Sequence, residues 1–325
     1  MTGARPLVAA GLFVVSGVVL ANPVRVFLER MEDAAHTLSY TGTFVYRHGP
    51  TLAAMHIVHR AADGHVTERL TTEDGRRQII IGSRGRVTCY LPGEHKEFVA
   101  RRAPSWRAFP AILPVHLKPL QRFYAWRLGG RARLAGRVAR LLVIAPRDDY
   151  RYGYRLWADQ KTGLLLKVSV VDDRSRRIEQ LLFTHLRVRA HIPASAVGPI
   201  GAPPGNPYKL ERSELFPDPQ PTWTLRPGVP GFRLVTSLMR RSARHKGVVQ
   251  HLVYSDGLAE VSVIIGRRRQ AVAHAELLRL GALHVFRTMV GRRMVTALGD
   301  VPASTVERMA LSVRRITPKV TPAMP

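Results

Sequence analysis

Residues 38–70 read LSYTGTFVYRHGPTLAAMHIVHRAADGHVTERL, and this stretch decides the fold class. Apolar and polar side chains alternate along 40–48, and a second strand is expected over 52–59; alternation is the period of a half-buried β-strand. Asp63-Gly64 is typical of a two-residue hairpin turn, and a third strand is expected over 65–70. The sequence therefore predicts consecutive antiparallel strands in this region.

A helix is expected before this stretch, and further strands are expected after it. Asn22 suits a helix N-cap and Pro23 the first helical position, and the apolar side chains that follow at helical spacing are Phe27, Leu28, Met31, Ala35 and Leu38. Further strands are expected over 77–81, 86–91, 96–99, 130–145, 150–158, 163–172 and 177–188. An antiparallel sheet of this many strands must curl, so the helix and the segment 104–128 are expected to cover its inner face.

The second half of the chain is a separate, smaller α+β unit. Residues 193–207 read PASAVGPIGAPPGNP, which is too poor in apolar bulk to pack, so a linker is expected at about 191–215. It separates a domain over 22–190 from one over 216–325. In the latter, strands are expected over 233–238, 248–254 and 258–266, with two more in 283–298 and a helix from Pro302.

The first 21 residues have the pattern of a signal peptide. Arg5 precedes an apolar run over 7–20 that would span about 21 Å as a helix, which is short of the ~30 Å hydrocarbon core of a membrane. Residues 1–21 are therefore expected to be removed near Ala21 on export to the periplasm, with an uncleaved anchor as the alternative.

The composition allows a packed core and is strongly basic. Of 325 residues, 46% are hydrophobic and 22% charged, and the formal net charge is +27. Residues 22–190 hold 30 cations against 15 anions, and residues 216–325 hold 17 against 6. Such a surface favours acidic proteins or lipid phosphates, although the arginine content also fits a compositional bias. No nucleic-acid partner is predicted, because the chain is expected to be exported.

No motif for catalysis or metal binding is present. The single cysteine, Cys89, excludes an internal disulfide and a cysteine metal cluster, and it is expected inside a strand. His56 and His59 are three apart in a predicted strand and therefore face opposite sides. Asp148-Asp149 lies in a turn context, where aspartates bond the local backbone. We predict a protein that is not an enzyme and that uses no cofactor and no metal.

Residues 104–128 are the candidate cover of an apolar cavity. Four prolines prevent one long helix, yet the segment carries too many large apolar side chains for a surface. The candidates to line a lipid cavity are Trp106, Phe109, Leu113, Phe123 and Trp126. The rim candidates for phosphate are Arg76, Arg77, Arg101 and Arg102. A permanently closed core is the alternative.

Several strings, taken in order, resemble the RseB/MucB family of periplasmic regulators of the envelope-stress sigma factor. In the first domain they include Leu38-Ser39-Tyr40-x-Gly42-x-Phe44-Val45-Tyr46 and Pro146-Arg147-Asp148-x-Tyr150-Arg151-Tyr152-Gly153-Tyr154-x-Leu156-Trp157. In the second they include Pro227-x-x-Pro230-Gly231-Phe232 and His251-x-x-Tyr254-Ser255-Asp256-Gly257-Leu258-Ala259. Together these and shorter strings cover nearly all of 22–315.

The resemblance implies a first domain like the lipoprotein carriers, a curved antiparallel half-barrel with covering helices, and a second domain that helps hold a partner. The partner would be the periplasmic part of a membrane-spanning anti-sigma factor. The protein would shield it from proteolysis and release it on sensing lipid or lipopolysaccharide. A lipid or lipoprotein carrier is the alternative function, and a homo-oligomer stays open.

The partner-binding candidates lie in the second domain. They are Trp223, Phe232, Tyr254 and Asp256. Tyr254 and Asp256 are expected at a tight turn with exposed side chains that serve recognition. The alternative is that Asp256-Gly257 only sets the geometry of a hairpin.

Overall fold

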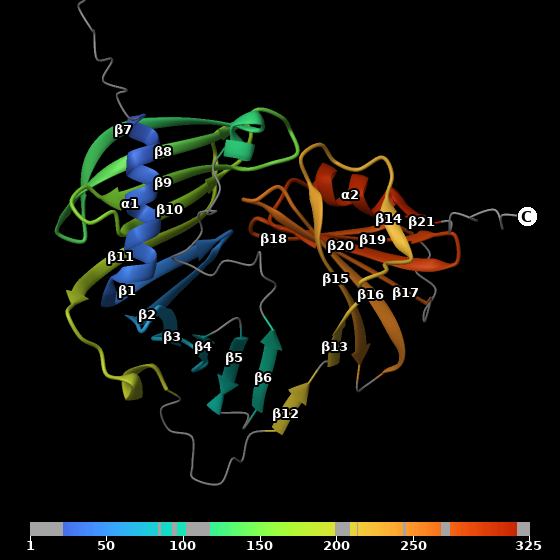
Figure 1. The fold of residues 1–325 in the computed structure, drawn as a ribbon, viewed down its shortest axis with the longest axis horizontal. Coiled ribbons are helices and arrows are strands. Elements are labelled where there is room, and N and C mark those ends of the chain that lie inside the picture. Colours follow the sequence, from blue (N-terminus) through green and yellow to red (C-terminus); the bar gives the residue numbers. More distant parts are fainter. Residues whose placement is uncertain are drawn as a thin grey trace, which may run out of the picture.

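The computed structural model describes residues 22–83, 86–92, 96–101, 118–198, 209–212, 214–242, 245–267 and 274–316. These residues form two sheet units, which lie side by side (Figure 1). The predicted signal peptide lies outside the described residues. Within them, no helix is long and apolar enough to cross a membrane.

The first unit is a large open sheet of 12 strands in the order β12-β6-β5-β4-β3-β2-β1-β11-β10-β9-β8-β7. All neighbours with a given register are antiparallel except β12 and β6, which run parallel. The strands are β1 (Ser39–His48), β2 (Thr51–Ala62), β3 (His65–Thr72), β4 (Ile79–Ser83), β5 (Arg86–Leu91), β6 (Lys96–Arg101), β7 (Tyr124–Leu134), β8 (Arg137–Pro146), β9 (Gly153–Asp159), β10 (Leu165–Val171), β11 (Arg177–Arg189) and β12 (Lys209–Arg212). Two short 3-10 helices accompany them, η2 (Lys118–Arg122) and η3 (Ala194–Val197).

Helix α1 (Pro23–Thr37) lies across the inner face of this curved sheet (Figure 1). The side chain of Asn22 accepts a hydrogen bond from the backbone N–H of Val24 at 3.0 Å, so the predicted N-cap is confirmed. The apolar stripe of α1 packs into a core whose fully buried members include Tyr40, Ile57 and Leu142. The described part of the first unit thus has an apolar core under α1.

The second unit is a sheet of seven strands in the order β13-β15-β16-β17-β20-β19-β18, with a separate β14-β21 pair. Helix α2 (Ala303–Leu311) packs on one face, where Val306, Met309 and Ala310 are fully buried. The strands are β13 (Glu214–Pro217), β14 (Trp223–Leu225), β15 (Arg233–Ser242), β16 (His245–Ser255), β17 (Glu260–Arg267), β18 (Glu276–Leu280), β19 (Leu283–Val290), β20 (Arg293–Gly299) and β21 (Val313–Arg315).

The predicted fold class is confirmed: a curved antiparallel sheet covered by a helix, with a smaller α+β unit. Some elements differ from the prediction. The strand expected over 130–145 is a hairpin around Ala135-Gly136, and β7 already begins at Tyr124, where loops and short helices were expected. Trp126 and Leu128 alternate toward the core, so a strand forms here although prolines precede it in the sequence. Strand β12 lies within the stretch predicted as linker, where it pairs with β6.

A candidate site where the two sheets meet

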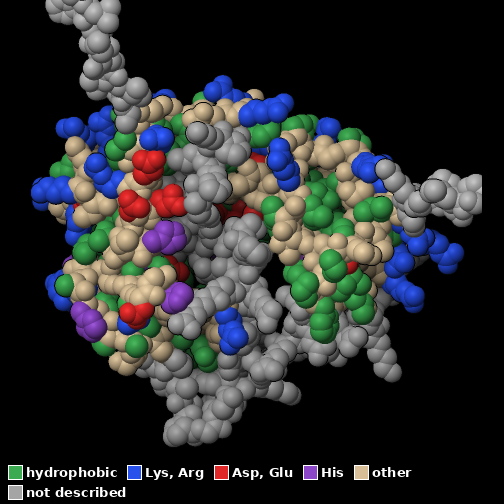
Figure 2. Space-filling view, in the orientation of Figure 1, with side chains coloured by type: hydrophobic (Ala, Val, Ile, Leu, Met, Phe, Trp, Pro, Cys, Tyr) green, Lys and Arg blue, Asp and Glu red, His purple; other side chains and the backbone are tan. Residues whose placement is uncertain are grey.

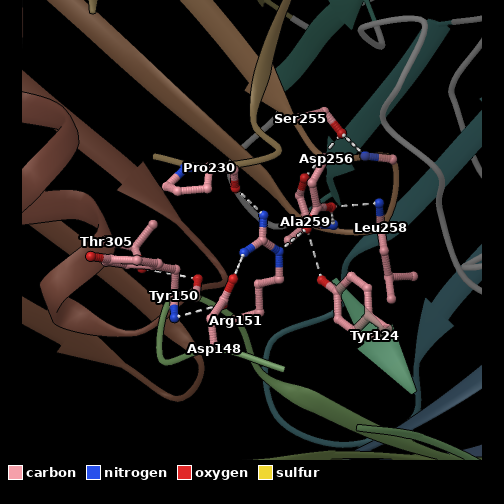
Figure 3. A network of polar contacts seen from close by, with 11 residues as sticks. Tyr124, Asp148, Tyr150, Arg151, Pro230, Ser255, Asp256, Leu258, Ala259 and Thr305 are labelled. Atoms are coloured by element: carbon pink, nitrogen blue, oxygen red, sulfur yellow. Dashed lines mark hydrogen bonds and ion pairs between the residues drawn. The ribbon is translucent and has the colours of Figure 1, made fainter. Parts of the chain in front are cut away.

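Arg151 is the centre of a polar network between the two units (Figure 3). It lies in the turn between β8 and β9 and is only 2% exposed. Its Nε donates to Oδ2 of Asp256 in the second unit at 2.6 Å. The same guanidinium donates to the carboxylate of Asp148 and to the carbonyl oxygen of Pro230. One side chain of the first unit thus binds two segments of the second.

Aromatic rings surround this guanidinium. The carbon at its centre lies 4.5 Å from the ring centroid of Phe123 and 4.9 Å from that of Phe232, which are cation–π distances. Gly231 has a φ of +84°, and a Cβ atom there would lie 2.5 Å from Nη2 of Arg151. The glycine is therefore required both by its backbone conformation and by the close approach of the arginine.

Asp256 has two separate functions in the network. Its Oδ1 accepts the backbone N–H groups of Leu258 and Ala259, each at 2.8 Å, and so shapes the turn between β16 and β17. Its Oδ2 accepts Arg151 and the hydroxyl of Tyr124, the latter at 2.9 Å. The predicted turn geometry is thus present, and the same carboxylate also joins the two units.

The electrostatics of the network stabilise the charged pair. Burial alone would lower the pKa of Arg151, but the carboxylates of Asp256 and Asp148 outweigh this effect and raise it. Burial and the negative charge of Asp256 hold the pKa of the Tyr124 hydroxyl well above its ordinary value. The two shifts favour a charged guanidinium at Arg151 and a protonated hydroxyl at Tyr124.

A second contact joins the units at Glu179 of β11. Its Oε1 accepts the backbone N–H of Ala282 at 2.7 Å, and its Oε2 accepts the Tyr46 hydroxyl at 3.0 Å. Gly281, in the β18–β19 turn, has a φ of +63°, and a Cβ atom there would lie 2.4 Å from Oε1 of Glu179. Loss of solvation and the negative charge of Glu179 raise the pKa of Asp300 to about 6.

Helix α2 makes a third contact. The Thr305 hydroxyl donates to the backbone carbonyl of Tyr150 at 2.9 Å, and Arg308 donates to the Tyr150 hydroxyl at 2.8 Å. The three contacts together fix the orientation of the second sheet against the β8–β9 turn and β11. These contacts consist of hydrogen bonds and ion pairs. No group of three or more potential metal ligands occurs among the described residues.

The predicted partner-binding residues occupy this junction or the core beside it. Phe232 and Asp256 meet at Arg151, whereas Trp223 is half-buried on β14, with Arg293 5.9 Å from its ring centroid. The expectation that Tyr254 and Asp256 are exposed is wrong, because both are buried. Tyr254 packs in the core of the second unit, and Asp256 faces the first unit. Their part in partner binding stays a prediction.

The predicted lipid-cavity residues are only partly described. Trp106, Phe109 and Leu113 lie outside the described residues. Phe123 stacks on Arg151 at the junction, and Trp126 packs against the core under α1. Both side chains are also partly buried against the same apolar core, and their part in a lipid cavity stays a prediction.

The predicted rim arginines belong to the β3–β6 part of the first sheet, but the register places them at opposite strand ends: Arg76 and Arg77 lie beyond Thr72, whereas Arg101 pairs with Arg86 at the other end. Arg76 and Arg77 are exposed in the turn between β3 and β4. Arg101 ends β6, and Arg102 lies outside the described residues. Burial and the positive charge of Arg77 lower the pKa of Arg69, so positive charge does accumulate near Arg77. Phosphate binding by these arginines stays a prediction.

The sequence did not single out Arg151, Tyr124 or Glu179 as site residues. Arg151 occurs in a string that carries the family resemblance, which was the available signal. From hydropathy alone, Arg151 is expected to be a solvated turn residue. Its partner Asp256 is 105 positions away along the chain, so the local sequence does not indicate the pair.

The fold and the junction define a class of protein: a two-domain binding protein in which a curved open sheet is fastened to a smaller sheet. The chain belongs to the MucB/RseB family, whose N-terminal domain matches residues 23–200 and whose C-terminal domain matches residues 217–314. The boundary between these two matches falls between the two sheet units.

Named relatives agree with this assignment. The sigma factor AlgU regulatory protein MucB of Pseudomonas aeruginosa is 34% identical over 302 residues, which cover 89% of this chain and 90% of that protein. The sigma-E factor regulatory protein RseB of Escherichia coli is 23% identical over 290 residues, which cover 88% of this chain and 89% of that protein.

Solved structures of MucB superpose on both units. A crystal structure of MucB in complex with MucA(peri) is 32% identical, has a TM-score of 0.71, and covers 90% of this chain and 99% of that one. The complex structure of Pseudomonas aeruginosa MucA/MucB, also 32% identical, has a TM-score of 0.72 and covers 91% and 100%.

Proposed function

We propose that this protein is a periplasmic negative regulator of an envelope-stress sigma factor. It binds the periplasmic part of a membrane-spanning anti-sigma factor and shields that segment from proteolysis. Lipid or lipopolysaccharide releases the segment. The observation that carries the proposal is the likeness, over both units, to a relative solved in complex with MucA(peri).

The junction supports a partner site that needs both units. Three polar contacts hold the second sheet at one orientation against the first, so a peptide that touches both meets a preformed surface. Preorganisation of this kind lowers the entropic cost of binding. It favours a regulator over a lipid or lipoprotein carrier, which would need the first unit alone.

The charge of the chain supports an acidic partner. Lysine and arginine side chains are spread over the visible face of both units, and exposed apolar side chains gather over the second (Figure 2). With a net charge of +27, encounter with an acidic segment is accelerated at low salt. Association should slow clearly as the Debye length falls to ~8 Å at physiological ionic strength.

The proposal is tested by titrating the full mature protein with the purified periplasmic segment of the cognate anti-sigma factor. We expect a saturable complex, an association rate that falls with salt, and slower cleavage of the segment by an added protease when the complex is formed. Absence of a complex at low salt would overturn the proposal.

The release step needs its own measurement. Because α1 packs against the apolar core of the first unit, we expect lipid to enter by displacing an element of that unit. Lipopolysaccharide or a fluorescent fatty acid, added to the preformed complex, should displace the segment. If wild-type protein takes up neither, lipid sensing is wrong while partner binding stands.

A further inference from the structure

Strand β18 is an exposed apolar edge of the second sheet. All five of its side chains are exposed, and the leucines are exposed by 45% (Leu277), 50% (Leu278) and 61% (Leu280). Its only neighbour in the sheet is β19. A free apolar edge is a template for pairing with another strand.

The three other edges carry protective features. Strand β13 has four residues and ends at Pro217, and β12 has four residues of which three are charged. Strand β7 is long, but its register shifts between Leu128 and Arg131, and its exposed positions are arginines and a glycine. Short length, charge, proline and bulges are the usual means of blocking edge pairing. Strand β18 has five residues with one arginine and one glutamate, and it has no proline and no register shift.

The hairpin geometry shows which backbone groups point outward. Gly281 and Ala282 form a two-residue turn, so the flanking pair Leu280 and Leu283 is hydrogen-bonded across the hairpin. Hydrogen-bonded and non-bonded pairs alternate along an antiparallel ladder. The N–H and C=O groups of Leu277 and Arg279 therefore point away from β19, toward the open edge.

The position of β18 connects this edge to the junction. Its hairpin ends at Gly281 and Ala282, which contact Glu179 and His48 of the first unit. Strand β18 lies on the side of the second unit nearest the first (Figure 1). A strand added along β18 would thus reach the first unit at its end, and it would contact both sheets.

We propose that β18 is a docking edge for an extended acidic peptide, which adds as an eighth strand to the second sheet. This inference rests on the proposed function, and the peptide is the periplasmic segment of the anti-sigma factor. Its apolar side chains pack on the exposed leucines, and its acidic side chains face Arg279 and the basic surface of the unit. An unpaired strand edge binds backbone, so it selects a peptide over a lipid.

The test uses proline at an outward position, which removes one edge donor while leaving the β18–β19 ladder intact. Arg279→Pro should weaken binding of the anti-sigma segment at least tenfold. Arg279→Gln removes the same charge and keeps the N–H, so its loss should be only two- to threefold. Arg133→Pro is the matched control, because Arg133 stands in the same place beside the two-residue turn of β7. It should bind as wild type does.

Hydrogen exchange keeps the proposal falsifiable if Arg279→Pro fails to fold. In the wild-type complex, amide exchange at Leu277 and Arg279 should slow by at least tenfold. Unchanged exchange in a saturated complex would overturn the docking edge and leave the proposed function standing. No complex with wild-type protein would overturn both. Protection that appears without the segment and rises with protein concentration would instead assign the edge to a second copy of the chain.

Discussion

Two of the contacts between the sheet units differ in character. At Arg151, a fully buried guanidinium is paired with a fully buried carboxylate and surrounded by aromatic rings. At Glu179, one carboxylate binds a turn of the partner unit and lies near a second acid, Asp300. The carboxylates around Arg151 raise its pKa, so this guanidinium stays charged, whereas the pKa of Asp300 beside the Glu179 contact is about 6. The charge next to the Glu179 contact therefore changes near pH 6, and that of Arg151 does not.

The largest expected effect comes from removing the guanidinium. Arg151→Met leaves Asp256 buried with an uncompensated charge, and breaking one partner of a buried pair costs about 3–5 kcal/mol. Thermal and urea unfolding should show a loss of that size. Hydrogen exchange should rise in 229–232 and 253–259 while the core under α1 stays protected. Equal loosening of both regions would contradict an interdomain role.

A smaller effect is expected at the Glu179 contact. Gly281→Ala combines a left-handed backbone with a clash against Glu179. Gly291→Ala is the matched control, because Gly291 has a φ of +59° in the next two-residue turn and no atom within 4 Å of its Cβ position. Backbone strain costs both variants about 1 kcal/mol, and the clash should cost Gly281→Ala about 1 kcal/mol more. Equal stabilities of the two variants would contradict the close contact between Gly281 and Glu179.

The smallest expected effect is a dependence on pH. The pKa of Asp300 is about 6 in the folded protein against 3.8 for the free side chain, so its ionised form costs stability above pH 6. That cost is relieved as the pH falls through 6 toward 4. Asp300→Asn should therefore melt above wild type at pH 7.5, because its side chain stays neutral. The difference should shrink at pH 5, and a constant difference across this range would count against the assignment.

The sequence predicts the local structure better than the contacts between the units. Asn22 caps α1 because capping needs only neighbouring residues, and Asp63-Gly64 turns a hairpin for the same reason. Strand β18 was missed because its leucines do not alternate with polar residues; both of its faces are exposed. Arg151 was missed because its burial depends on residues brought in by the second unit. Caps and turns depend on neighbouring residues and can be predicted from the sequence. The Arg151–Asp256 pair depends on how the two sheets pack and cannot.

A double-mutant cycle of Arg151 and Asp256 tests most directly whether this pair fastens the units. Asp256→Asn keeps Oδ1 as an acceptor for the Leu258 and Ala259 amides, so it removes the charge without losing the turn. Unfolding free energies of wild type, Arg151→Met, Asp256→Asn and the double variant should give a coupling of about 2 kcal/mol. The double variant should then be more stable than the sum of the single losses allows. Additive losses of unfolding free energy would contradict the claim that the Arg151–Asp256 pair joins the two units.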